Sequence, residues 1–128
     1  MAPARVLIVD DAAFMRTMIA DILQREGEFE VVGQASTGTE ALERYRELRP
    51  TLVTMDIVMP GMDGIEATRA IIKEDPDARI VMCSALGQEA RVIESIAAGA
   101  KDFIVKPFTA EKVIRVMQNV LAASGTAA

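Results

Sequence analysis

Short apolar runs alternate with longer segments of helical periodicity along the whole chain. The runs have four or five residues, and the Gly, Pro or acidic residues that flank them are typical of buried strands. The second run is the least apolar, so we expect it at an edge of the sheet. The predicted strands are residues 5–9, 29–32, 52–55, 79–83 and 102–105.

Each apolar run is followed by a segment whose apolar residues recur at helical spacing. In the first such segment, Ala12 to Glu26, the apolar stripe consists of Phe14, Met18, Ile19, Ile22 and Leu23. Gly27 suits the C-cap of this helix. Thr37 followed three residues later by Glu40 predicts a capping box, and Asp63 is expected to cap the third helix. The other helices are predicted at about 37–48, 63–74, 89–98 and 109–122.

The strict alternation of strands and helices predicts an α/β fold, a parallel sheet with helices on both of its faces. For five strands the commonest arrangement is the flavodoxin-like (βα)5 order 2-1-3-4-5, in which ligands bind where the order reverses, between strands one and three. The 128 residues contain no linker and no repeat, so we expect one domain over 1–128. The small, polar tail at 124–128 is expected to fray.

Composition narrows the classes of function. The net charge of -5 and the lack of a basic run argue against nucleic-acid binding. No apolar stretch reaches the roughly 18 residues of a membrane span, so we expect a cytoplasmic protein without membrane insertion. The charge of -5 and the lack of a large apolar patch favour a monomer. The chain has no histidine, so any metal site must use hard oxygen ligands. Its single cysteine, Cys83, lies in an apolar run and is expected in the core.

Polar residues end four of the five apolar runs. Asp10 and Asp11 follow the first run, Asp56 the third, Ser84 the fourth and Lys106 the fifth. Parallel strands place their carboxyl ends at one edge of the sheet, where we expect these side chains to gather. Carboxylates about 4 Å apart repel by on the order of 1 to 4 kcal/mol, which a hard cation such as Mg²⁺ relieves. An aspartate can also attack phosphorus, with lysine and serine contacting the phosphoryl oxygens.

Each of these residues also has an ordinary structural explanation. Asp11 could cap the first helix, and Asp56 could be a turn residue before Pro60. Ser84 and Lys106 could be solvated residues of surface turns. Taken singly these explanations compete well, but coincidence explains the joint placement at four strand ends poorly.

Four motifs resemble the response-regulator receiver domains of two-component signalling. They are VLIVDD (6–11), MDIVMPGMDG (55–64), CSA (83–85) and DFIVKPF (102–108). The resemblance covers nearly the whole chain. It is greatest for the single-domain chemotaxis regulators of thermophilic and Gram-positive-type systems.

This resemblance implies that Asp56 is the phosphoacceptor and that Ser84 and Lys106 contact the phosphoryl group. The residues implied to hold Mg²⁺ are Asp10, Asp11, Asp56 and, through its backbone carbonyl, Val58. The peptide bond between Lys106 and Pro107 is expected to be cis, as is usual in the family.

The resemblance also implies a conformational switch. Phosphorylation would draw Ser84 inward and let Phe103, at the switch aromatic position, turn inward. The surface of the fourth helix, fifth strand and fifth helix would change, with Val92, Phe103 and Val105 as its candidate partner contacts. Phe103 lacks the hydroxyl of a tyrosine, and Val58 and Leu86 offer no hydrogen bond to an attacking water.

The implied function is that of a phosphorylation-activated regulator, not an enzyme beyond its own Mg²⁺-dependent phosphorylation and dephosphorylation. The implied partners are a CheA-like histidine kinase, the flagellar motor switch protein and a phosphatase of the phosphorylated form. An aspartate-dependent phosphatase is disfavoured because Val58 stands where its second acid belongs. A nucleotide-binding module is disfavoured because Asp-Asp-Ala-Ala at 10–13 repels phosphate. A stand-alone receiver of a sporulation or cell-cycle phosphorelay stays open.

Overall fold

A computed structural model describes residues 2–125 of the chain. The sheet contains five strands in the order β2-β1-β3-β4-β5, all paired in parallel. The strands are β1 (Ala4–Val9), β2 (Phe29–Ala35), β3 (Leu52–Asp56), β4 (Ile80–Ala85) and β5 (Asp102–Lys106). The helices are α1 (Ala13–Gln24), α2 (Gly38–Leu48), α3 (Gly64–Glu74), α4 (Glu89–Ala97) and α5 (Ala110–Gly125). This is the predicted flavodoxin-like order in a single domain, with β2 at an edge.

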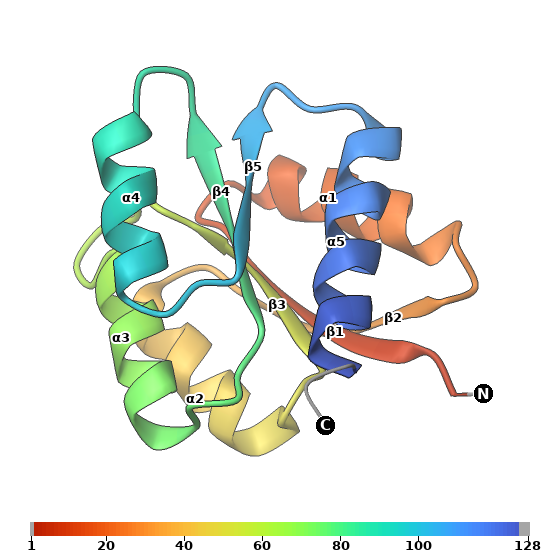
Figure 1. Cartoon of the computed structure of the whole chain (residues 1–128), viewed down its shortest axis with the longest axis horizontal. Helices are drawn as coiled ribbons and strands as arrows, with labels where there is room; N and C mark the ends of the chain where they lie inside the picture. Colours follow the sequence, from red (N-terminus) through yellow and green to blue (C-terminus); the bar gives the residue numbers. More distant parts are fainter. Residues whose placement is uncertain (1, 126–128) are drawn as a thin grey trace.

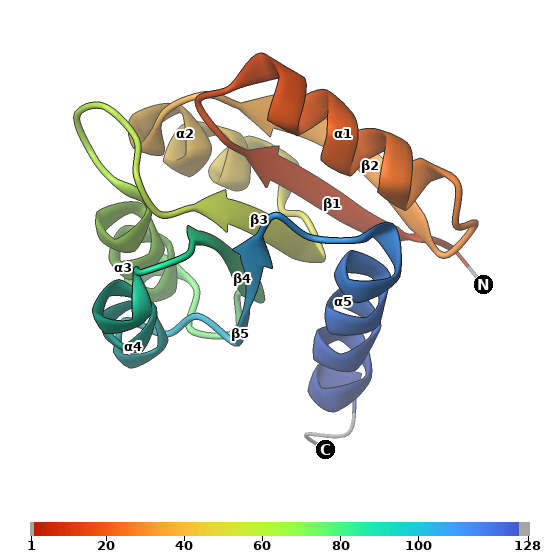
Figure 2. The same ribbon diagram turned by 90° about the horizontal axis from the view of Figure 1, so that it is seen from above.

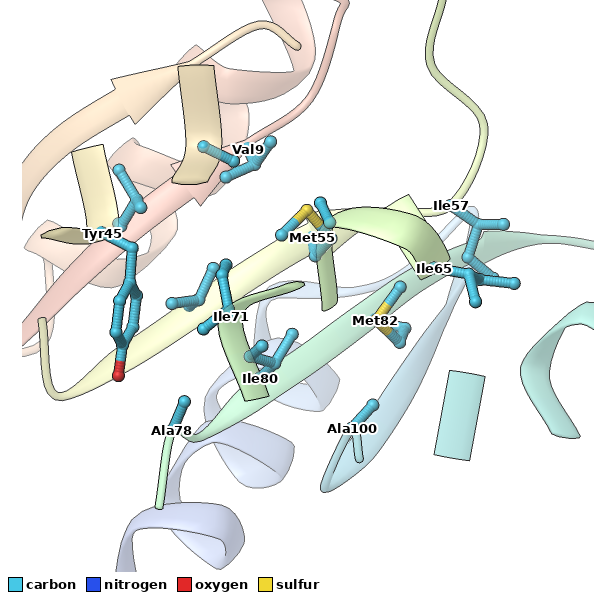
Figure 3. Packing of buried hydrophobic residues seen from close by; sticks show 14 of the residues in the cluster. Val9, Tyr45, Met55, Ile57, Ile65, Ile71, Ala78, Ile80, Met82 and Ala100 are labelled. Atoms are coloured by element: carbon cyan, nitrogen blue, oxygen red, sulfur yellow. The ribbon is translucent and has the colours of Figure 1, made fainter. Parts of the chain in front are cut away.

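Helices cover both faces of the sheet, so the strands are buried on both sides. Helices α1 and α5 lie on one face, and α2, α3 and α4 lie on the other (Figures 1 and 2). Successive strand residues point to opposite faces, and each face accordingly has its own core. Leu7, Val53 and Met82 belong to the core under α2–α4, part of which is shown in Figure 3, whereas Ile8 and Leu52 belong to the core under α1 and α5.

Several strands extend further than their apolar runs. Strand β2 continues to Ala35 past a register shift opposite Val6 and Leu7. Strands β3 and β5 include Asp56 and Lys106 as their last residues, and β4 includes Ser84. The sheet ladder therefore holds the backbone of these polar residues.

Helix α1 presents a different face to the sheet from the one we predicted. Ile19 and Leu23 are buried as expected, but Phe14 is 67% exposed and Met18 is 39% exposed. The helix begins only at Ala13, and the face that it buries is formed by Ile19, Ala20 and Leu23, which leaves Phe14 and Met18 outside the packed stripe. The prediction of a Gly27 C-cap was also wrong, because the C-cap is Arg25 in a right-handed conformation.

The predicted helix starts are largely confirmed. Thr37 caps α2 by accepting a hydrogen bond from the backbone N–H of Glu40. The Glu40 carboxylate bonds Ser36 instead of the cap residue, so this capping box is shifted by one residue. Asp63 and Glu66 form a complete capping box on α3. Helix α5 runs to Gly125, and the rest of the predicted frayed tail, 126–128, lies outside the described residues. Among the described residues, no helix is long and apolar enough to cross a membrane.

Candidate functional site

Strand register brings three charged residues to the same face and the same edge of the sheet. Val9 pairs with Met55, so Asp10 and Asp56 are neighbours just beyond that pair. Asp56 pairs with Cys83, and Cys83 pairs with Ile104, two residues before Lys106. Since strand side chains alternate with a period of two, Asp10, Asp56 and Lys106 all lie on the face covered by α1 and α5.

The predicted acidic cluster is present. One carboxylate oxygen from each of Asp10, Asp11 and Asp56 lies within 4.8 Å of the others. The ammonium group of Lys106 lies 3.2 Å from Asp10 Oδ2 and 3.1 Å from Asp56 Oδ1. One lysine therefore neutralises part of a site that contains three acids.

The two adjacent aspartates are held very differently. Asp10 is 1% exposed, and its Oδ1 accepts a hydrogen bond of 2.9 Å from the backbone N–H of Ala12. Asp11 is exposed. The N-cap of α1 is Ala12 and no side chain caps it, so the alternative that Asp11 serves as a helix cap is excluded.

Without a cation, the carboxylates of the cluster repel one another, and burial and this repulsion together shift the pKa of Asp56. Burial, followed by the charge of Asp10, raises the pKa of Asp56 to about 6, although Lys106 opposes the shift. Burial lowers the pKa of Lys106, but Asp56 and Asp10 outweigh that effect and leave the pKa raised above its usual value. Near neutral pH the site thus contains an ionised carboxylate that solvation alone does not stabilise.

The donor set fits a hard divalent cation. Three carboxylates at the carboxyl ends of β1 and β3 offer oxygen ligands only, close enough together to share an ion. Mg²⁺ is bound in proteins by one or two carboxylates together with water and substrate oxygens. Asp10, Asp11 and Asp56 are therefore suitable ligands, with Lys106 as a fixed positive charge beside them.

Ser84 is at the same edge but does not join the cluster by hydrogen bonds. It is buried, and its Oγ has no hydrogen-bond partner among the described residues. It stands one residue beyond Cys83 in β4, so strand alternation turns it toward the opposite face.

Val58, two residues after Asp56, exposes its side chain to solvent. Cys83 is buried as predicted, and burial raises the pKa of its thiol to about 12.

The predicted partner-contact residues are divided between surface and core. Phe103 is 39% exposed, and Val105 is half-buried. Val92 is only 9% exposed and packs in the core under α2–α4, which corrects the expectation that it lies on a partner surface. The exposed apolar residues of α4 are Ile93 and Ile96. The peptide bond between Lys106 and Pro107 is cis, as predicted.

Two residues to which the sequence assigned no role support the site. A Cβ on Gly64 would lie 1.9 Å from the carbonyl oxygen of Asp56, so only glycine allows α3 to start so close to β3. Arg16 donates a hydrogen bond of 2.7 Å from Nη1 to the carbonyl oxygen of Asp10. The place of Gly64 at the end of the motif MDIVMPGMDG (55–64) could have indicated the first contact, but no pattern in the sequence predicts the second.

Comparison with known proteins agrees with this geometry. The family model for the response regulator receiver domain matches residues 6–118. The chemotaxis protein CheY of Thermotoga maritima is 59% identical over 116 residues, covering 91% of this chain and 96% of that protein. CheY of Bacillus subtilis is 59% identical over 117 residues, covering 91% of this chain and 97% of that protein.

A solved structure gives the same result. The crystal structure of the CheX-CheY-BeF3-Mg+2 complex from Borrelia burgdorferi contains a chain that is 41% identical to this one. It matches with a TM-score of 0.88 over 92% of this chain and 89% of that chain. The chain therefore belongs to the family of response regulator receiver domains.

Proposed function

We propose that this protein is a phosphorylation-activated chemotaxis regulator that accepts a phosphoryl group on Asp56 from a CheA-like histidine kinase. The observation that carries the proposal is the buried Asp56 carboxylate beside Asp10, Asp11 and the ammonium group of Lys106. The named relatives point to chemotaxis, and they do not favour the alternative of a stand-alone receiver in another phosphorelay.

The transfer needs only groups that this chain supplies, one cation and the donor. A carboxylate oxygen of Asp56 attacks the phosphorus of a phosphohistidine, forming a P–O bond while the P–N bond breaks. The imidazole leaves with the bonding electron pair and takes up a proton from solvent. Mg²⁺ held by Asp10, Asp11, Asp56 and the Val58 carbonyl would neutralise charge on the carboxylates and phosphoryl oxygens.

Lys106 supports the product as well as the attack. Its ammonium group already lies within hydrogen-bond distance of Asp56. A positive charge fixed in a partly buried site stabilises charge that develops on the phosphoryl oxygens without reorganising during the transfer. The raised pKa of Asp56, about 6, leaves the nucleophile ionised at neutral pH.

The signal would reach a partner through Ser84 and Phe103. The buried Ser84 hydroxyl has no hydrogen-bond partner among the described residues, so an inward movement at the end of β4 would let it bond a phosphoryl oxygen on Asp56. Phe103 is partly exposed on β5, two residues before Val105, the residue that pairs with Ser84, and its inward rotation would alter the surface offered to a flagellar motor switch protein. Dephosphorylation would be assisted by a separate phosphatase, consistent with the CheX-containing complex of the Borrelia relative.

Two measurements test the proposal. Incubation with Mg²⁺ and acetyl phosphate should add one phosphoryl group to the wild type, detected by mass spectrometry, and none to Asp56→Ala. Equal uptake by the variant would remove the assignment of Asp56. A peptide from a flagellar motor switch protein should bind more tightly after beryllofluoride and Mg²⁺ are added. Unchanged affinity would favour the alternative, a stand-alone receiver in another phosphorelay.

A further inference from the structure

Arg16 contacts the turn that carries the two adjacent acids, although it belongs to none of the motifs. Its Nη1 donates to the carbonyl oxygen of Asp10 at 2.7 Å, and its Nε donates to Gln34 Oε1 at 3.1 Å. We propose that Arg16 is a positioning residue for the cation site, fixing the turn from β1 to α1 so that Asp10 is presented to Mg²⁺. This inference rests on the proposed Mg²⁺-dependent function.

With the bond from Arg16, every polar group of Asp10 has a partner. Its backbone N–H donates to the carbonyl oxygen of Ala35, and its carboxylate accepts from Ala12 and Lys106. The carbonyl oxygen is the fourth group, and Arg16 supplies its partner through a short hydrogen bond from a charged donor. The orientation of the Asp10 carboxylate thus depends on a backbone that is held from both sides.

The rest of the turn has little else to hold it. Asp11 is exposed, and the first turn of α1 carries the exposed Phe14 and has no side-chain cap. The 12-residue helix begins directly after the turn that carries Asp10 and Asp11, and Arg16, its fourth residue, reaches back to that turn. A single side chain from α1 therefore restrains the segment in which both acids lie.

Arg16 is itself anchored, so it can transmit a fixed position. Gln34 lies in β2, the edge strand next to β1, and binds the guanidinium on its other side. The carboxylate of Glu40, held by the backbone N–H and hydroxyl of Ser36, also attracts Arg16. The turn after β1 is thereby tied to the turn after β2 through the half-buried guanidinium.

Positioning and simple charge make opposite predictions for Mg²⁺ binding. A positive charge near the cluster repels the cation, so removing Arg16 would tighten Mg²⁺ binding if charge were its only influence. If Arg16 positions Asp10, its removal weakens Mg²⁺ binding despite the loss of repulsion. Groups that orient metal ligands from outside typically change metal affinity by about 10- to 100-fold when mutated, and a bond to a ligand's backbone should give less.

The experiment compares two variants. Arg16→Met keeps most of the length of the side chain but has no hydrogen-bond donor, whereas Arg16→Lys keeps the positive charge and donates through its ammonium group. We expect isothermal titration of Mg²⁺ to give an affinity about 3- to 10-fold weaker for Arg16→Met and within about 2-fold of wild type for Arg16→Lys. Arg115→Met is the control, since it removes an exposed arginine paired with Glu111 on α5. Unchanged or tighter binding by Arg16→Met would overturn the inference.

A second readout separates positioning from general loss of stability. In the Mg²⁺-free protein, the backbone amide of Ala12 reports the position of the Asp10 carboxylate through its hydrogen bond. Its NMR signal should shift in Arg16→Met and return toward the wild-type position in Arg16→Lys. An unshifted Ala12 signal in Arg16→Met would contradict the inference even if the melting temperature fell.

If Arg16→Met does not fold, Gln34→Leu provides a milder change, because it releases only the Nε side of the guanidinium. It should weaken Mg²⁺ binding by about 2-fold, and wild-type affinity would count against the inference. If the wild type binds Mg²⁺ and is phosphorylated on Asp56, and Arg16→Met binds Mg²⁺ equally well, only the role of Arg16 is contradicted. A wild type that does neither would remove the proposed function, and with it the role of Arg16.

Discussion

At the amino end of the sheet, Asp75 accepts a hydrogen bond of 2.7 Å from the Tyr45 hydroxyl and lies 3.8 Å from the Arg49 guanidinium. At the carboxyl end, Asp56 shares a single lysine with Asp10 and stands beside Asp11. Both ends combine buried apolar strands with aspartates and cations. They differ in whether the charges balance.

At the amino end, Asp75 and Glu74 each have a cationic or hydroxyl partner. The Arg49 guanidinium also lies over the Tyr45 ring, 5.7 Å from its centroid, and Arg46 forms an ion pair of 2.5 Å with Glu74 that joins α2 to α3. Burial and the bond to Asp75 raise the pKa of Tyr45, so its hydroxyl remains a donor at physiological pH. The charged groups at this end thus act on the stability of the fold.

The carboxyl end leaves polar groups short of partners. Three acids face one lysine, and the buried Ser84 hydroxyl has no partner among the described residues. Such groups cost stability in the isolated protein, and they are the ones a cation and a phosphoryl group would satisfy. The comparison therefore predicts that mutations at the two ends change stability in opposite directions.

The largest difference should appear in Asp56→Asn without metal. The pKa of Asp56 is raised to about 6 in the folded protein, against about 3.9 when unfolded, so the folded state binds more protons between those values. Wild-type stability therefore falls as pH rises through this window. Asparagine resembles the protonated acid, and above pH 6 the variant should be more stable by on the order of 3 kcal/mol.

Urea denaturation in EDTA at several pH values measures this difference. Near pH 4 the two proteins should be similar, because the wild-type carboxyl is then largely protonated. Saturating Mg²⁺ should reduce the advantage of the variant, since only the wild type offers the full set of ligands. A difference that does not depend on pH would contradict the assignment of the cost to the Asp56 charge.

The opposite sign is expected at the amino end. Tyr45→Phe removes a hydrogen bond to a carboxylate in a mostly buried setting and should lower the free energy of unfolding by about 1 to 2 kcal/mol. Mg²⁺ affinity and phosphorylation by acetyl phosphate should stay at wild-type values. A variant that retained wild-type stability would show that the balance at this end adds little to the fold.

Ser84→Ala tests the unpartnered hydroxyl. The variant should be as stable as the wild type or more stable by up to about 1 kcal/mol, because no hydrogen bond among the described residues is lost. Binding of a motor-switch peptide in beryllofluoride and Mg²⁺ should weaken, whereas binding without them should not change. Clear destabilisation would mean that Ser84 belongs to the structural framework instead of the switch.

The parallel sheet and the gathering of the acids at one edge could be predicted from chain order, whereas the strand order was predicted as the commonest arrangement of five such units. Alternation of strands and helices fixes a parallel sheet, and residues at the ends of parallel strands meet at one edge. Asp10, Asp56 and Lys106 therefore converge whatever the details of packing. The register adds that they share one face, which single strands could not reveal.

What could not be predicted depends on the rotation and reach of single side chains. Phe14 and Met18 fit a helical stripe, yet α1 packs through Ile19, Ala20 and Leu23 and leaves them exposed. The resemblance placed Val92 among the partner contacts, but a turn of about 100° per residue points it into the core while Ile93 beside it is exposed. Arg16 reaches the Asp10 carbonyl through a bond between a side chain and the backbone, and backbone acceptors leave no trace in sequence.

The smallest effect is expected where the loop after β3 meets α4. Asp63 caps α3 through Oδ1, while its Oδ2 pairs with Arg91 of α4 at 2.5 Å. Asp63→Asn keeps a good cap and removes only the ion pair, so we expect a loss of about 0.5 kcal/mol, since both side chains are partly exposed. Burial raises the pKa of the Asp63 carboxyl, but hydrogen bonds from the Glu66 backbone and from Arg91 outweigh burial and lower the pKa below its usual value. The stabilisation from this ion pair is therefore lost as pH falls below the usual range of aspartate.

Amide hydrogen exchange of α4 measures this contribution. It should be faster in the variant than in the wild type at neutral pH, and the two should agree at low pH. Unchanged exchange at both pH values would mean that packing alone holds this helix.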